Sequence, residues 1–354
     1  MAEAEYSIIK SYLSKKLYQK TTVLTIWQMC YSENMVGLHI FYFSLGLAIM
    51  WIASGLVVHG ITKFSKDVRV STFAASFLIL GVLTSLTEIS VGLNSVIEKR
   101  PTIFVGNLIG GSFVILMLII PVLAIFTGGI TLRHRLDQKK LLFFLLLLAA
   151  PAFLILDGFV SSYDAVLLIL LYVVFFNLFQ SEEKLLDHLK RGAQKKSSAA
   201  LRDILGIIIG AVLIYAAGKI LVDQTIFAAQ LLDVPAMLIS LLVLSLGTNM
   251  PELMIAARSL RAGHTEVAFG DYVGSAATNT LLFAVFTLMH GSFAIETKGF
   301  APLFFVIIGG YITFFIFARI KNRISPLEGL SLILIYVIFT LFQISEILTL
   351  SAKV

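Results

Sequence analysis

The chain has 354 residues, of which 58% are hydrophobic and only 14% are charged, whereas about 25% of the residues in a typical soluble domain carry a charge. A soluble fold of this length would have to bury nearly all of its apolar surface, and so few charges could not keep its exterior free of apolar patches. The one cysteine, Cys30, excludes a disulfide framework, a CxxC redox site and a thiolate metal site. The composition therefore predicts a membrane protein.

The first 35 residues differ from the rest of the chain, because they carry four lysines and little continuous apolar sequence. The apolar stretch 23–30 is short, is interrupted by Gln28 and precedes no small-residue cleavage pattern, so we do not expect a signal peptide. The tail instead predicts an amphipathic helix lying in the membrane interface, with an apolar face made of Tyr6, Ile9, Leu13, Leu17 and Trp27.

Ten apolar segments follow, and a helix needs about 20 such residues to cross the hydrocarbon core. They comprise residues 38–61, 70–97, 102–126, 141–156, 162–179, 201–222, 236–257, 267–288, 300–318 and 327–348. The fourth and fifth are short and separate at Asp157 and Gly158. The longest connection, 181–200, is a polar linker that divides the spans into two sets of five, within residues 36–180 and 201–354. We therefore expect an all-α integral membrane protein with ten transmembrane helices.

The basic residues test this plan, because Lys and Arg accumulate in short cytoplasmic loops. They cluster in every second connection, at 63–69, 133–140, 184–202, 258–261 and 319–323. The intervening connections hold only Lys99, Arg100 and Lys298. The net charge of +6 thus reflects topology rather than nucleic-acid binding. The pattern predicts a multi-pass protein of the cell membrane whose partner is the lipid bilayer, with a cytoplasmic linker and both termini outside.

An internal repeat relates the two halves at a constant offset of 164 residues. Residues 84–88, TSLTE, correspond to residues 248–252, TNMPE, and residues 106–111 correspond to residues 270–275 without a gap. Five crossings are an odd number, so the second copy must have the opposite orientation in the membrane. Inverted-topology repeats are typical of secondary transporters, which bind their substrate near the midplane where the repeats meet.

Glu88 and Glu252 are the most informative residues of the chain. Both lie well inside apolar spans, where an ionisable group costs about 2.5 to 3.5 kcal/mol on insertion scales. A bound cation would compensate for this cost, whereas two protonated structural carboxyls are the simpler alternative. Residues three and four apart share a helix face, so oxygen-bearing side chains accompany each carboxylate. Thr84 and Ser85 lie on the face of Glu88, whereas Thr248 and Asn249 lie on the face of Glu252. Such oxygens suit hard cations such as Ca²⁺ and Na⁺.

The surrounding sequence predicts an asymmetric site. Pro251 removes a helix hydrogen bond and frees the carbonyl of Gly247, so we expect an unwound turn just before Glu252. The following helix provides a facing wall, with Asp271, Ser275 and Asn279 at one-turn spacing. In the first half the positions that match Ser275 and Asn279 are Gly111 and Ile115, which form an apolar wall.

These motifs resemble the two α-repeats of the calcium/cation antiporter superfamily, which contains the sodium/calcium exchangers. Residues 246–252, LGTNMPE, followed by 270–275, GDYVGS, are similar to the second repeat, and residues 84–88 and 106–110 to the first. The resemblance implies Ca²⁺ exchange for Na⁺ or H⁺, without a cofactor, by alternating access. It also implies a set of Ca²⁺ ligands and flanking residues: Glu88 and Glu252, the carbonyls of Thr84 and Thr248, and the side chains of Ser85, Asn249, Ser275 and Asn279.

The departures from the family pattern leave the counter-ion open. Thr87 stands where the family has Pro, both Asn249 and Gly111 stand where it has Ser, and Asn279 stands where many exchangers have Asp. Only two carboxylates are certain instead of three, and this lower number weakens the predicted Na⁺ sites. H⁺/Ca²⁺ exchange is therefore the alternative to Na⁺/Ca²⁺ exchange. A transport-inactive scaffold or regulator is a further alternative. An intramembrane enzyme is not expected, because the histidines form no ligand-spaced pair.

Overall fold

The computed structural model describes residues 36–53, 55–56, 85–131, 138–180, 201–249, 252–253, 265–321 and 323–352. The predicted interfacial helix of the tail and the linker at 181–200 lie outside these residues. The chain divides into two compact units, Met1–Leu45 and Gly46–Val354. The first is described only from residue 36, where it is helical, and the second contains all the other elements discussed below.

Seven helices of the described part are long and apolar enough to cross a membrane: Val36–Ala53, Pro101–Phe126, Gln138–Asp157, Ile208–Leu232, Tyr272–His290, Phe300–Ile320 and Pro326–Ser351. Three shorter apolar helices cover Leu86–Ile97, Ser162–Leu178 and Ala236–Thr248. Each of the ten segments expected from the sequence overlaps one of these helices. The chain is therefore a multi-pass, mostly helical membrane protein.

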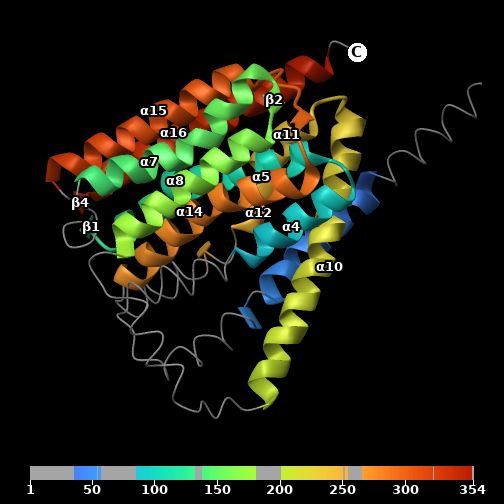
Figure 1. The fold of residues 1–354 in the computed structure, drawn as a ribbon, viewed down its shortest axis with the longest axis horizontal. Coiled ribbons are helices and arrows are strands. Elements are labelled where there is room, and N and C mark those ends of the chain that lie inside the picture. Colours follow the sequence, from blue (N-terminus) through green and yellow to red (C-terminus); the bar gives the residue numbers. More distant parts are fainter. Residues whose placement is uncertain are drawn as a thin grey trace, which may run out of the picture. The chain divides into compact units, whose positions relative to one another are not determined.

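Figure 1 shows the helical elements of both halves of the chain. In the first half they are α4 (Leu86–Ile97), α5 (Pro101–Val114), the π-helix η2 (Ile115–Ile119), α6 (Ile120–Phe126), α7 (Gln138–Leu154), the 3₁₀-helix η3 (Ile155–Asp157) and α8 (Ser162–Gln180). In the second they are α10 (Leu201–Leu232), α11 (Ala236–Ile239), the π-helix η4 (Ser240–Leu244), α12 (Ser245–Thr248), α14 (Thr265–His290), α15 (Phe300–Lys321) and α16 (Pro326–Ser351). Proline at the first helical position begins α5 and α16, where its missing N–H costs nothing.

Two boundaries show how local chemistry sets the ends of helices. The predicted break after η3 is present, because Gly158 adopts a left-handed conformation with φ 80° and ends the helix. The predicted end of α10 at residue 222 is wrong, since this helix continues to Leu232. Asp223 does not stop it, because its carboxylate lies 3.6 Å from Lys219 one turn earlier, an arrangement that stabilises a helix.

Two short strand pairs join the halves. β1 (Ile130–Thr131) pairs antiparallel with β4 (Arg323–Ile324), and β2 (Phe159–Val160) pairs antiparallel with β3 (Phe293–Ala294). When the chain is shifted by 164 residues, β2 coincides with β4 and β1 falls within one residue of β3. The same shift places α7 on α15 and α8 on α16. The shift therefore relates the pair β1–β4 to the pair β2–β3, and it relates α7 and α8 to α15 and α16.

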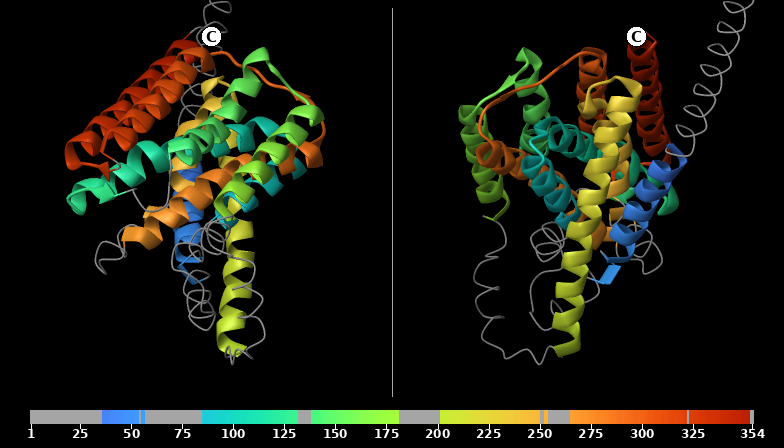
Figure 2. Two further views of the ribbon diagram at one scale, coloured as in Figure 1. Left: turned by 60° about the vertical axis from the view of Figure 1, so that its left-hand side comes forward. Right: turned by 90° about the vertical axis from the view of Figure 1, so that its right-hand side faces the viewer.

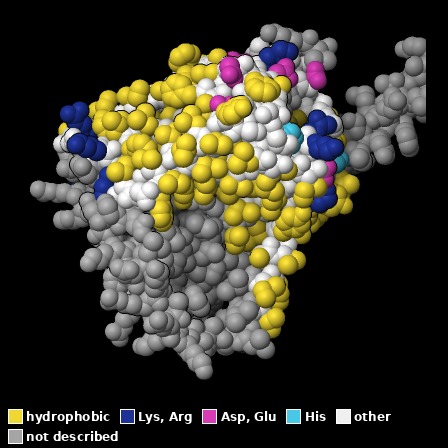
Figure 3. Space-filling model, in the orientation of Figure 1, with side chains coloured by type: hydrophobic (Ala, Val, Ile, Leu, Met, Phe, Trp, Pro, Cys, Tyr) yellow, Lys and Arg dark blue, Asp and Glu magenta, His cyan; other side chains and the backbone are white. Residues whose placement is uncertain are grey.

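Packing separates a tight interior from an apolar exterior. Hydrophobic side chains cover the face formed by α7, α8, α15 and α16, including exposed Leu170, Phe305 and Leu334, as expected where lipid is the solvent (Figure 3). Inside, α5 packs against η4, α12 and α14. A Cβ on Gly106 would lie 3.0 Å from the backbone nitrogen of Leu241, so only glycine lets α5 approach η4 this closely. Figure 2 shows the teal segment that contains α4 and α5 in the interior, among the other helices.

Candidate cation site

Two fully buried carboxylates from opposite halves of the chain form the centre of the site. Glu88 lies in the first turn of α4, and Glu252 belongs to the short helical stretch 252–253. Both side chains are completely buried, and they lie near enough for their negative charges to repel each other. Burial of a charge without a compensating partner is unfavourable. The pair therefore creates a strong local demand for positive charge.

Thr87 connects the two halves at the edge of this pair. Its hydroxyl lies 2.6 Å from Oε2 of Glu88 and 3.1 Å from the main-chain carbonyl oxygen of Thr248. A hydroxyl has one hydrogen, so it can donate fully to only one of these acceptors at a time. Carboxylate and carbonyl oxygens are both ligand types of hard cations. Thr87 thus lies between a carboxylate oxygen from the first half of the chain and a carbonyl oxygen from the second half.

The helix that precedes Glu252 ends where the sequence predicts an interruption. α12 ends at Thr248, and Asn249 forms a turn with φ −85° and ψ 14°; Pro251 lies outside the described residues. The Thr248 hydroxyl lies 3.1 Å from Oδ1 of Asn107, on α5. The sequence predicts no role for Asn107, although its match to Asp271 at the repeat offset marks it as a candidate.

Helix α14 provides the predicted wall beside Glu252. The hydroxyl of Ser275 donates to Oε1 of Glu252 at 2.9 Å. Both groups are fully buried, so this bond holds one carboxylate oxygen in a fixed position without neutralising it. Ile115 is buried at the start of η2.

Asn249 and Asn279 extend the site on the side of α5. The Asn249 amide donates to the carbonyl of Ser245 at 2.7 Å, and the Asn279 amide donates to the hydroxyl of Ser112 at 3.4 Å. Both amides lie around Gly111, since a Cβ placed there would be 2.9 Å and 3.1 Å from the two Nδ2 atoms. The sequence predicts Gly111 to be a lost ligand position, whereas the structure shows that its missing side chain makes room for two carboxamides.

Several acceptor atoms of this cluster receive no hydrogen bond from the described part of the chain. They include Oε1 of Glu88, Oδ1 of Asn249 and Oδ1 of Asn279. Buried polar atoms normally have partners, and an oxygen acceptor without a donor is suited to bind a cation or water. Among the described residues, no group of three or more His, Cys, Asp and Glu side chains is present. Among the described side chains, the donor set therefore comprises a carboxylate pair and neutral oxygens.

The structure brings together most of the predicted residues. Glu88, Glu252, Thr248 and Ser275 are linked by hydrogen bonds or by charge, and Asn249 and Asn279 share the space beside Gly111. Ser85 is fully buried in the turn before α4. Thr84 lies outside the described residues, and of Asp271 only the backbone, within α14, is described.

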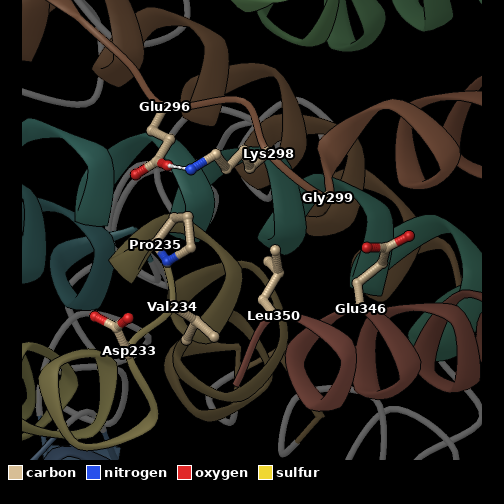
Figure 4. Close-up of a pocket in the computed structure, with 8 residues that line it drawn as sticks. All are labelled: Asp233, Val234, Pro235, Glu296, Lys298, Gly299, Glu346 and Leu350. Atoms are coloured by element: carbon tan, nitrogen blue, oxygen red, sulfur yellow. Dashed lines mark ion pairs between the residues drawn. The ribbon is translucent and has the colours of Figure 1, made fainter. Parts of the chain in front are cut away.

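A surface pocket elsewhere has a different character. It has a volume of about 690 Å³ and is lined by residues of the α10–α11 connection, the segment before α15 and the end of α16. Lys298 pairs with Glu296 at 3.1 Å on one side of the pocket, and Glu346 lies on the other (Figure 4). The paired side chains are 72% and 55% exposed, so water solvates their charges. This pocket lacks the burial that makes Glu88 and Glu252 candidate ligands.

Comparisons with known proteins identify the family of the chain. Residues 38–179 and 203–345 match the family model described as sodium/calcium exchanger protein. The chain is 24% identical over 349 residues to the sodium/calcium exchanger MaX1 of Methanosarcina acetivorans, covering 86% of this chain and 98% of MaX1. It is 23% identical over 256 residues to the inner membrane protein YrbG of Escherichia coli, covering 67% and 78% of the two chains.

The fold is also known. A solved structure of the sodium-calcium exchanger NCX_Mj, soaked with Na⁺ and Sr²⁺, matches with a TM-score of 0.59 at 22% identity, over 85% of this chain and 97% of NCX_Mj. At this identity the likeness concerns the fold. Together with the family match over both halves, it leads to one conclusion: the chain belongs to the sodium/calcium exchanger family of membrane transporters.

Proposed function

We propose that the chain is a secondary antiporter that exchanges Ca²⁺ for Na⁺ by alternating access. The observation that carries the proposal is the buried pair of Glu88 and Glu252, which approach each other from the two halves. Two ionised carboxylates neutralise one Ca²⁺, and the neutral oxygens around them supply further ligands. Thr248, Ser275, Asn249 and Asn279 provide these oxygens, with Ser85, Thr84 and Asp271 as further candidates.

Exchange follows from the cost of leaving this pair empty. Without a cation, two negative charges would face each other in a site from which water is excluded, and this state is too unfavourable to cross the membrane. Ca²⁺ can therefore leave only when Na⁺ or H⁺ takes its place on the same oxygens. The competition couples the two ions, whereas a channel would require a site that can be empty.

We further propose that two inverted repeats of five helices each, residues 36–180 and 201–354, form the transporter. The recurrence of helices and strands at 164 residues and the family match to each half support this organisation. Residues 1–35 would form an interfacial tail and residues 181–200 a cytoplasmic linker. The distribution of Lys and Arg favours insertion in the plasma membrane with both termini outside.

Exchange of Ca²⁺ for H⁺ is the second candidate, and the two buried carboxylates of Glu88 and Glu252 support it. Each glutamate can accept one proton, and two protons would balance one Ca²⁺. Ca²⁺ uptake by proteoliposomes under an outward Na⁺ gradient, and separately under an outward H⁺ gradient, distinguishes the candidates. We expect uptake with the Na⁺ gradient. Uptake that depends on the pH gradient alone would refute Na⁺ coupling.

Thr87 provides a prediction about release of the ion. In Thr87→Val the shape is kept but the hydroxyl that donates to Glu88 at 2.6 Å is lost. The empty carboxylate then loses a stabilising donor, so cations should bind it more tightly, by roughly fivefold for a bond worth about 1 kcal/mol. Equilibrium ⁴⁵Ca²⁺ binding to the purified protein measures the change. Unchanged or weaker binding would show that the hydroxyl does not stabilise the empty state.

A further inference from the structure

Gly111 and Asn249 lie side by side, and each differs from its counterpart in the other half of the chain. At the repeat offset, Gly111 corresponds to Ser275 and Asn249 corresponds to Ser85, so each has a serine as its counterpart in the other half. One position has lost its side chain and the other carries a larger one. The structure places these two exceptions side by side, with a Cβ on Gly111 only 2.9 Å from Nδ2 of Asn249.

The orientation of the Asn249 carboxamide follows from its hydrogen bond. Its 2.7 Å contact is with the carbonyl of Ser245, which can only accept, so the atom facing that carbonyl must be the nitrogen. The oxygen therefore points elsewhere, and it receives no hydrogen bond from the described part of the chain. Asn249 is fully buried, so this oxygen is a buried acceptor in need of a ligand.

Asn279 has the same arrangement on α14. The Ser112 hydroxyl lies 3.1 Å from the carbonyl of Leu108 and donates to it, so it accepts the contact from Asn279, which must therefore be made by the amide nitrogen. The Asn279 oxygen is likewise buried and receives no hydrogen bond from the described residues. The two carboxamides around Gly111 thus each keep a neutral buried oxygen without a donor. Asn249 precedes Glu252 by three residues, and Asn279 lies one helical turn after Ser275, whose hydroxyl donates to Glu252.

Neutral oxygens discriminate between cations by charge. The cost of removing water from an ion rises with the square of its charge, whereas its attraction to a neutral dipole rises only in proportion to the charge. A wall of carboxamides therefore compensates a monovalent ion better than a divalent one, while carboxylates favour the divalent ion. We propose that Gly111 and Asn249 act as one coupled pair that sets the selectivity of the site between Na⁺ and Ca²⁺; this inference rests on the proposed antiport.

Four variants test the coupling. Gly111→Ser and Asn249→Ser each give one position the residue of its repeat counterpart, the double variant changes both, and Asn249→Asp keeps the shape but adds a charge. Gly309→Ser is the matched control, because nothing lies within 4 Å of a Cβ placed there. Purified protein is titrated with ⁴⁵Ca²⁺ in increasing Na⁺, which gives the Ca²⁺ Kd and the Na⁺ concentration that displaces half of the Ca²⁺. Size-exclusion profiles show whether each variant is folded.

In Gly111→Ser the added side chain displaces the carboxamide, whose far end can move without a backbone shift, so the protein should stay folded. We expect about tenfold more Na⁺ to be needed for displacement. Asn249→Ser removes the carboxamide oxygen and should also raise the Na⁺ needed. The double variant should need less Na⁺ than the product of the two single effects predicts, because the smaller serine at 249 leaves the room that the serine at 111 requires. Asn249→Asp should tighten Ca²⁺ binding by about tenfold and also raise the Na⁺ needed.

Two results would overturn the inference. One is independence, in which the effects of Gly111→Ser and Asn249→Ser simply multiply in the double variant. The other is a set of folded variants that displace Ca²⁺ at the same Na⁺ concentration as wild type and Gly309→Ser. If the wild-type protein binds no ⁴⁵Ca²⁺, or if Na⁺ never displaces it, the proposed Na⁺/Ca²⁺ exchange itself is wrong, and the inference falls with it.

Discussion

Glu88→Gln is expected to abolish Ca²⁺ transport, lowering the initial rate of uptake at least about 100-fold. Glutamine has the same shape but no charge, so half of the negative charge that neutralises Ca²⁺ is lost. Removing one partner of a buried contact between opposite charges, here carboxylate and Ca²⁺, costs about 3 to 5 kcal/mol. Glu252→Gln should have an effect of the same size. The rates are measured in proteoliposomes that contain equal amounts of folded protein, as judged by size exclusion.

Glu98→Gln is the matched control for this substitution. Glu98 follows α4 directly and pairs with Lys219 at 2.7 Å, but its side chain is 35% exposed. Exposed ion pairs contribute at most about 1 kcal/mol, so this variant should transport within about threefold of wild type. If both Glu88→Gln and Glu252→Gln transported like wild type, the buried pair would not be the cation site. If wild type and all variants failed to move ions, the alternative of a membrane scaffold or regulator would be favoured.

Gly106→Val is expected to prevent stable folding. The side chain would be forced against the backbone of the facing helix, at Leu241 and at the carbonyl of Met237. Backbone cannot move aside as a side-chain end can, so α5 would have to separate from η4. Overpacking of this kind typically costs 1 to 3 kcal/mol and sometimes more. We expect a loss of monodisperse protein in detergent, or a melting temperature about 1 to 4 °C lower in a thermal-shift assay.

Gly309→Val is the control, since a Cβ at this position of α15 meets nothing within 4 Å. It introduces the same β-branched residue into a helix and should change the melting temperature by little. A Gly106→Val protein as stable as Gly309→Val would show that α5 and η4 are not held this closely. The position of α5 matters for the site, because this helix carries both Asn107 and Gly111.

The positions of the helices along the chain could be predicted from the sequence because lipid imposes simple rules. Apolar segments of sufficient length become helices, and this rule located the regions that the structure describes as spans. The same rule made Glu88 and Glu252 conspicuous, since carboxylates inside apolar segments are rare and costly. Ser275 followed from helical spacing alone, and the structure places its hydroxyl on Glu252.

Contacts between helices could not be predicted in this way. They depend on the rotation and separation of neighbouring helices, which periodicity does not specify. Thr87 looked like a lost proline until its hydroxyl was seen between Glu88 and the carbonyl of Thr248. Gly111 likewise looked like a lost ligand, although its role is to leave space for Asn249. The π-helices and the two-residue strands are too short to leave a periodic signal.

The obligatory coupling of two ions is tested most directly by ²²Na⁺ efflux. Proteoliposomes are loaded with ²²Na⁺ and diluted into Na⁺-free medium with or without external Ca²⁺. If the pair of Glu88 and Glu252 cannot cross the membrane empty, efflux should be negligible without external Ca²⁺, should rise sharply when Ca²⁺ is added, and should be absent in Glu88→Gln. Efflux that proceeds equally well without Ca²⁺, or that persists in Glu88→Gln, would contradict antiport through this site.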